Sequence, residues 1–134
     1  MILVDAGPLV ALIHADDKHH RRCREVLRSL DEPLATVWPP VTEAMYLLDF
    51  AWRGQEALWK FVERGALDLL PLGLDDVPRM RELMRQHRDL PMDFADASLV
   101  RVAEREGIQR IFTLDRRDFS VYRARGIGSL EVLP

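Results

Sequence analysis

The chain has 134 residues, of which 48% are hydrophobic, and its formal net charge is −3 at neutral pH. This length and composition favour one globular domain spanning residues 1–134, with a core that buries roughly two-thirds of the surface of the unfolded chain. The acidic balance gives no overall attraction to nucleic acid, so an anionic substrate would have to be held locally.

Short apolar runs that indicate buried strands alternate along the chain with amphipathic runs that indicate helices. Breaks fall at Gly7-Pro8, Pro39-Pro40, Gly54, Gly65 and Gly107. The elements predicted in chain order are strand 2–4, helix 7–14, helix 19–30, strand 34–37, helix 40–52, helix 55–64, strand 66–72, helix 75–87, helix 93–106, strand 110–114 and strand 129–133.

The predicted strands are short and apolar on both faces. Strands of this kind, separated by helices, are typical of a parallel sheet that helices cover on both sides. The sequence therefore predicts an α/β fold with a central parallel sheet of about five strands.

Cysteine usage and hydropathy bear on the compartment. The single Cys23 excludes an intramolecular disulfide framework and suits a reducing compartment such as the cytoplasm. The apolar start of the chain carries Asp5 and lacks a basic segment, which is not typical of a secretory signal peptide. No apolar run reaches the length of a membrane span. We therefore expect a cytoplasmic protein that does not enter a membrane.

The segment PMDFADASLV, residues 91–100, places two aspartates three positions apart at the start of a predicted helix. Asp93 precedes the periodic run and fits an N-cap, whose side chain accepts a hydrogen bond from a free backbone N–H. At about 100° per residue, Asp96 falls inside the apolar arc of this helix and Asp93 falls at its edge. A carboxylate among core-facing residues is costly unless it is paired, hydrogen-bonded or bound to a metal. The sequence therefore predicts a partner for Asp96.

Other acids follow the predicted strands. Asp5 ends the first strand, Glu43 lies in the first helical turn after the second, and Asp115 ends the fourth. Because the carboxyl ends of parallel strands share one edge of a sheet, we expect these acids to converge, with Asp96 joining them if its helix begins there. Clustered carboxylates repel unless a cation neutralises them, and oxygen-only ligands favour Mg²⁺ or Mn²⁺.

Four segments carry a family resemblance: VDAGPLVAL at the start, the acid within VTEAMYLL, DFADASLVRVAEREG, and TLDRRDF. Their order and spacing resemble the PIN domain, a family of metal-dependent ribonucleases that includes the VapC-type toxins of bacterial toxin–antitoxin pairs. The resemblance covers nearly the whole chain. It implies a three-layer α/β/α sandwich, often assembled as a homodimer.

The resemblance also implies roles for individual residues. The family's catalytic acids carry over onto Asp5, Glu43, Asp96 and Asp115. All of these except Glu43 are expected to be metal ligands. Thr113 matches the hydroxyl residue commonly found before the last acid. We expect three residues beside the ligands rather than among them, namely Asp93, Thr113 and Asp118, with contact to a second metal as the alternative for Asp118.

Each acid also has a plainer interpretation. Asp5 could cap the helix that begins at Gly7-Pro8, and Glu43 could be an acid favoured by the helix dipole. Asp118 could be an ordinary turn or cap residue. Without the family match, Glu43 is the weakest candidate, because periodicity places it only on the flank of the apolar stripe.

Three further groups of residues attract a functional interpretation. His19, His20 and Cys23 could bind a metal, but no second ligand pair stands at the spacing of a zinc site. The tryptophans are expected to pack, Trp52 and Trp59 in a core or subunit interface, with base stacking as the alternative for Trp38. A basic helical band could contact phosphate, although a solvated face is the usual role of such a run; the band consists of Arg21, Arg22, Arg24 and Arg28.

The leading functional hypothesis is metal-dependent hydrolysis of RNA. The family resemblance implies that cleavage leaves a 3′-hydroxyl and a 5′-phosphate, and that a small antitoxin is a possible partner. A haloacid-dehalogenase-like phosphatase needs a second Asp two positions after the first, where this chain has Gly7. A response-regulator receiver needs a Lys after a late strand, and the last lysine here is Lys60. The alternative kept open is a non-catalytic PIN-like module that binds nucleic acid or protein.

Overall fold

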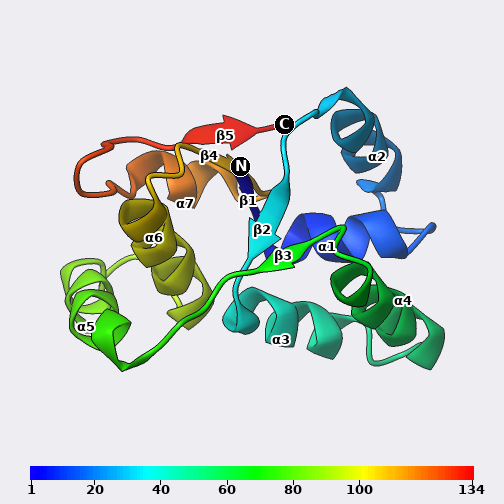
Figure 1. Ribbon diagram of the computed structural model, residues 1–134, viewed down its shortest axis with the longest axis horizontal. Helices are drawn as coiled ribbons and strands as arrows, with labels where there is room; N and C mark the ends of the chain where they lie inside the picture. The colour runs from blue at the N-terminus through cyan, green and yellow to red at the C-terminus, as the bar shows by residue number, and fades with distance from the viewer.

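The computed structural model describes residues 1–134 and contains a five-stranded sheet and seven α-helices (Figure 1). The strands are β1 (Ile2–Val4), β2 (Leu34–Thr36), β3 (Asp68–Leu69), β4 (Arg110–Phe112) and β5 (Glu131–Leu133). The helices are α1 (Ala6–Ile13), α2 (His20–Ser29), α3 (Trp38–Leu47), α4 (Trp52–Glu63), α5 (Val77–Gln86), α6 (Phe94–Glu106) and α7 (Arg116–Val121), with a 3₁₀ turn η1 (Leu74–Asp76) before α5.

The strand order explains where a ligand site can form. All strands are parallel, in the order β3-β2-β1-β4-β5. The chain adds β2 and β3 on one side of β1 and then crosses to the other side for β4 and β5. This reversal makes the carboxyl edge between β1 and β4 a topological switch point, the position at which open α/β sheets bind ligands.

Alternate side chains of β1 enter two separate cores. Leu3 packs with residues of α5, α6 and α7, whereas Ile2 and Val4 pack with residues of α1, α2, α3 and α4. The two groups of helices flank the central strands in Figure 1. The predicted three-layer α/β/α sandwich with a parallel five-stranded sheet is therefore confirmed.

The helix after β2 differs from the prediction. α3 begins at Trp38, two residues before Pro40, and ends at Leu47 instead of continuing to residue 52. Both Pro39 and Pro40 fit its first turn, because the backbone N–H groups there have no acceptor within the helix. The expectation that Glu43 lies in the first helical turn is wrong, since the earlier start places it in the second turn.

Three other parts of the chain differ more than by a residue or two at an element's end. Gly54 does not interrupt a helix, because α4 begins at Trp52 and includes it. A Cβ at Gly54 would lie 3.3 Å from Leu48 Cδ2, so the glycine permits close packing there. The strand expected at 66–72 is reduced to the two residues of β3, and the short helix α7 was not predicted.

The helix that carries Asp96 matches its prediction. α6 begins after the N-cap Asp93 and ends at Gly107, which has a left-handed φ of 69°. A side chain in that conformation would be strained, so glycine suits the end of the helix. None of the helices in the structure combines the length and the apolar character that crossing a membrane requires.

Candidate active site

The carboxyl edge of the sheet is hollowed beside the switch point. A cavity of about 250 Å³ is lined there by six acidic side chains and by no lysine, arginine or histidine. These acids are Asp5, Glu43, Asp93, Asp96, Asp115 and Asp118. The structure thus brings all four acids predicted to be catalytic around one hollow, together with two of the residues predicted to lie beside them.

Asp5 links the two strands that border the switch point. Its Oδ1 accepts a hydrogen bond from the N–H of Ala6 at 2.8 Å, so the residue does cap α1. Its Oδ2 accepts a hydrogen bond from the hydroxyl of Thr113, also at 2.8 Å. Thr113 Oγ1 in turn accepts from the N–H of Asp115 at 3.0 Å. Thr113 therefore holds Asp5, after β1, in a fixed relation to Asp115, after β4.

The two aspartates of α6 differ in burial and in partners. Asp93 is exposed, and its Oδ1 accepts a hydrogen bond from the N–H of Asp96 at 2.9 Å. Asp96 is only 7% exposed, and its Oδ2 accepts a hydrogen bond from the hydroxyl of Tyr122 at 2.9 Å. The cap at Asp93 starts the helix in the position that directs Asp96 into the hollow.

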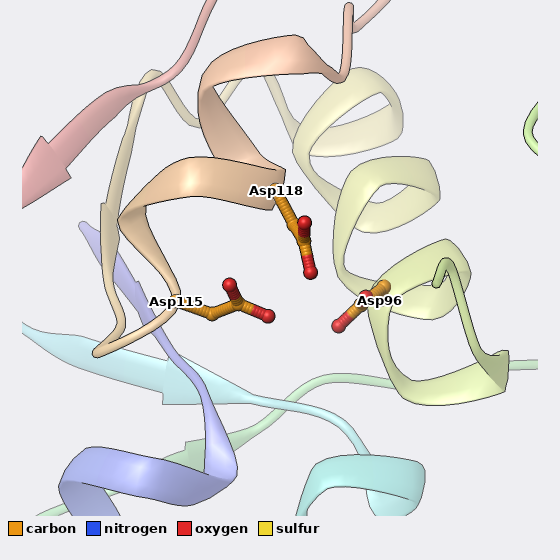
Figure 2. Close-up of side chains that lie close together, drawn as sticks. All are labelled: Asp96, Asp115 and Asp118. Carbon is orange, nitrogen blue, oxygen red and sulfur yellow. The ribbon is translucent and has the colours of Figure 1, made fainter. Parts of the chain in front are cut away.

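A closer group of carboxylates forms where α6 and α7 meet. Asp96, Asp115 and Asp118 each present a carboxylate oxygen, and these oxygens lie within 4.8 Å of one another. Figure 2 shows the three side chains pointing toward a common space, Asp115 from the start of α7 and Asp118 from its first turn. Asp5 and Glu43 line the same hollow but are outside this group. Asp118 is therefore a member of this carboxylate group and not simply a turn residue.

The buried position of Asp96 perturbs its titration. Burial, together with the charges of Asp93 and Asp5, raises the pKa of this carboxyl to about 8, although the hydrogen bond from Tyr122 opposes the rise. Burial also raises the pKa of Asp5, although its two hydrogen bonds counteract the effect. A raised pKa means that the negatively charged form of an acid is disfavoured. The groups around the hollow therefore do not fully compensate the negative charge of its carboxylates.

The remaining two predicted catalytic acids show the same trend. Burial and the adjacent Asp118 raise the pKa of Asp115 to about 6. Partial burial, followed by the charges of Asp5, Asp93 and Asp115, raises the pKa of Glu43. Glu43 and Asp115 are both exposed, whereas Asp5 and Asp96 are buried, so the hollow joins two solvent-facing carboxyl groups to two buried ones.

This donor set fits a hard divalent cation. All the available ligand atoms are carboxylate oxygens, and no sulfur or imidazole ligand lines the hollow. Mg²⁺ and Mn²⁺ prefer such oxygen ligands, and a cation would compensate the charge that raises the pKa values of these acids. The acidic cluster can therefore bind a metal ion.

Tyr122 is a site residue that the sequence did not reveal. It is 1% exposed and follows α7, and its ring contacts those of Phe119 and His87 edge-on, with both centroid distances at 5.2 Å. Its hydroxyl is the hydrogen-bond partner that Asp96 required. No local pattern marks this contact, because the two residues are 26 positions apart and meet only when α7 packs against α6.

The structure supports no metal site at Cys23 and His20 and no core position for two of the tryptophans. Cys23 is fully buried, and burial raises the pKa of its thiol to about 11, which leaves it a poor metal ligand. His20 Nδ1 lies 2.7 Å from the carbonyl oxygen of Ala11, so it serves α1–α2 packing. Trp52 and Trp59 are 68% and 48% exposed, so they do not pack in the core, and the alternative of a subunit interface stays a prediction.

The cap at Asp93 gives a stability prediction. Asp93→Asn and Asp93→Ala both remove one negative charge from the hollow, but only Asn can still accept the hydrogen bond from Asp96 N–H. We expect the free energy of unfolding of Asp93→Ala to be about 1 kcal/mol lower than that of Asp93→Asn, which corresponds to a Tm lower by roughly 3–5 °C. Thermal melts of the two variants, measured without metal, test this; equal melting would show that the cap contributes nothing.

The hydrogen bond from Tyr122 gives a second prediction. Tyr122→Phe keeps the ring packed against Phe119 but removes the donor that reaches buried Asp96. Leaving a buried acceptor with one donor fewer costs about 1–3 kcal/mol, so the Tm should fall by several degrees. Tyr46→Phe is the matched control, because Tyr46 is 73% exposed and its hydroxyl makes no hydrogen bond within the protein. If both variants have the Tm of the wild type, the hydrogen bond from Tyr122 to Asp96 does not contribute to stability.

Known proteins resemble this chain over nearly its full length. A family model described as PIN domain matches residues 2–124. Ribonuclease VapC26 of Mycobacterium tuberculosis is 28% identical to the chain over 137 aligned positions, which cover 99% of this chain and 100% of that protein.

Solved structures share the fold. The crystal structure of VapC20 from Mycobacterium tuberculosis, a sarcin–ricin loop cleaving toxin, superposes with a TM-score of 0.77 at 21% identity, covering 83% of this chain and 87% of that one. A toxin–antitoxin complex from Klebsiella pneumoniae superposes with a TM-score of 0.71 at 13% identity, covering 100% and 97%. At these identities the superpositions concern the fold alone.

Proposed function

The chain belongs to the PIN domain family, and from this premise we propose that it is an endoribonuclease that hydrolyses RNA phosphodiester bonds with Mg²⁺ or Mn²⁺. The observation that carries the proposal is the hollow at the switch point, lined by six carboxyl groups and no basic side chain. The likeness to a protein named a ribonuclease supports the same activity.

We assign the metal ligands from this donor set. Asp5, Asp96 and Asp115 hold the cation, and Asp118 is a further ligand because its carboxylate belongs to the same close group. A divalent cation bound there supplies Lewis acidity and neutralises the charge that develops on the scissile phosphate. Thr113 and Tyr122 keep the carboxylates of Asp5 and Asp96 oriented by donating hydrogen bonds to them.

Glu43 completes the proposed chemistry as a proton acceptor. It lies at the rim of the hollow, and its raised pKa makes its carboxylate a better base than an ordinary glutamate. A carboxylate oxygen of Glu43 takes a proton from the attacking water while the water oxygen bonds to phosphorus. The bond from phosphorus to the 3′ oxygen breaks, and this oxygen takes up a proton from solvent water while Glu43 later releases its own to solvent, leaving a 3′-hydroxyl and a 5′-phosphate.

The biological role that the relatives suggest is that of a toxin. VapC20 is described as a toxin, and the Klebsiella pneumoniae structure is a toxin–antitoxin complex. We infer that this chain is the toxin of such a pair, that a small antitoxin inhibits it, and that it acts in the cytoplasm as a homodimer. The reading frame beside its gene should then encode the antitoxin, and co-expression of that product should suppress RNA cleavage.

Cleavage of a labelled single-stranded RNA tests the proposed activity. The purified protein should cut the RNA in Mg²⁺ or Mn²⁺, and cleavage should stop when EDTA removes the metal. The products should be substrates for an exonuclease that requires a 5′-phosphate. A non-catalytic PIN-like module is the competing function, and it would bind RNA or protein without cutting under any of these conditions. The intact set of carboxyl groups favours the enzyme.

A further inference from the structure

A second hollow adjoins the acid-lined one. It has a volume of about 650 Å³ and lies between α3 and the start of α6. Three aromatic side chains line it, from Trp38, Tyr46 and Phe94, and none of its lining residues is basic. We call this hollow the aromatic groove. Glu43 and Asp93 line both the aromatic groove and the acid-lined hollow, so the two are continuous.

The aromatic side chains of this groove are unusually open to solvent. Trp38 is 48% exposed, Tyr46 is 73% exposed and Phe94 is 50% exposed. The ring of Trp38 is held edge-on by Trp59, with the centroids 6.2 Å apart and the planes at 62°. Part of the Trp38 surface is therefore fixed in orientation yet uncovered, which suits contact with a flat, apolar ligand.

The position of the groove restricts what that ligand can be. A nucleotide whose phosphate lies among the carboxylates of the acid-lined hollow has its neighbouring base within reach of the groove, since the two share Glu43 and Asp93. Neither hollow offers a basic side chain to the RNA backbone. Apart from the proposed cation, affinity at these two hollows must therefore come from contacts without charge, and base–aromatic stacking provides about 1–3 kcal/mol per base.

We propose that the aromatic groove holds an unpaired base of single-stranded RNA next to the scissile phosphate, with Trp38 as the stacking residue. This inference rests on the proposed ribonuclease function and identifies where the RNA substrate is bound. A protein segment is the less favoured occupant, because covering the groove would bury Glu43 and Asp93, neither of which forms an ion pair. A stacked base can leave their oxygens in water.

The experiment combines protein and RNA changes. Cleavage of a labelled single-stranded RNA of twelve nucleotides is measured in Mn²⁺, and its Kd is measured in Ca²⁺, which also takes oxygen ligands. Trp38→Ala should weaken binding about tenfold and lower kcat/KM in proportion. Trp38→Phe should retain most of the affinity, since phenylalanine also stacks. Trp52→Ala is the control, because Trp52 is more exposed than Trp38 but lies outside the groove, and it should bind like the wild type.

An abasic ribose tests the same contact from the side of the RNA. Replacing each base near the cleavage point in turn should reveal one position whose loss reproduces the tenfold effect. In Trp38→Ala that same abasic RNA should bind no worse than the intact RNA, because the stacking partner is already absent. If Trp38→Ala fails to fold, the abasic series on the wild type still decides whether one unpaired base is held, and the absence of any such position overturns the inference.

The outcomes separate the inference from the proposed function. If the wild type cuts RNA and neither Trp38→Ala nor any abasic position changes binding, the inference is wrong and the ribonuclease stands. If the wild type binds with Trp38-dependent affinity but never cuts, the stacking site stands and the catalytic proposal fails. If it neither binds nor cuts RNA, both are overturned. If Trp38→Ala alters only the association state in sedimentation, the groove is a protein interface and the inference is overturned.

Discussion

Asp96→Asn should abolish metal-dependent cleavage of RNA while leaving the protein folded. Asparagine has nearly the shape of aspartate, and its carbonyl oxygen can still accept the hydrogen bond from Tyr122. The substitution removes the charge from the buried member of the close group of carboxylates. Because the lost interaction acts on the charge that develops in the transition state, we expect a fall in kcat of roughly 10³-fold or more. The measurement is cleavage of labelled RNA in Mn²⁺, beside a thermal melt.

Asp93→Asn is the matched control for this experiment. It removes one charge from the same hollow, on the same helix, and asparagine still caps α6. We expect it to keep much of the activity. If Asp93→Asn is as inactive as Asp96→Asn with an unchanged melt, Asp93 is itself a ligand and the assignment is wrong. If both variants cut like the wild type, the activity belongs to another site or to a contaminant.

The sequence predicted the scaffold of the site well, for local reasons. The strands before Asp5 and Asp115 are short apolar runs, and alternation with helices implies a parallel sheet whose carboxyl ends meet. Helix 93–106 was bounded correctly because the cap residue and the glycine at its two ends are chemical signals in the sequence. The same periodicity placed Asp96 inside and Asp93 at the edge, as the structure has them.

The errors arose where several conformations satisfy the same local rules. A helix can begin so that Pro40 is its first residue or its third, because no backbone N–H is needed at either position. The sequence therefore could not decide the turn that carries Glu43. The helix α7 has only six residues, too few for a periodic pattern, and its packing is what brings Asp118 and Tyr122 to the cluster.

The metal-free protein should become less stable as the pH rises from about 5 to about 8. The pKa of Asp96 is raised to about 8 and that of Asp115 to about 6. In this range the folded state retains protons that the unfolded chain has released, so the free energy of unfolding falls as the pH increases. Below about pH 5, the free energy of unfolding should instead fall as the pH decreases. The cause is that ion pairs and hydrogen bonds lower the pKa values of Asp76 and Glu104 in the folded state despite their burial. Stability should therefore be greatest near pH 5.

Comparison with Asp96→Asn isolates the cause, because the variant retains Asp76 and Glu104 and removes the titration of one acid whose pKa is raised to about 8. Without metal, the Tm of the wild type should fall by roughly 5 °C or more between pH 5 and pH 8, and that of Asp96→Asn should fall much less. Millimolar Mn²⁺ at pH 7.5 should raise the wild-type Tm by mass action, since a ligand at 100 times its Kd adds about 2.7 kcal/mol to the stability of the folded state. The variant should gain less, because one ligand has lost its charge. A metal-free wild type whose Tm is constant over this pH range, and which does not respond to Mn²⁺, would show that the six carboxyl groups do not form a shared cation site.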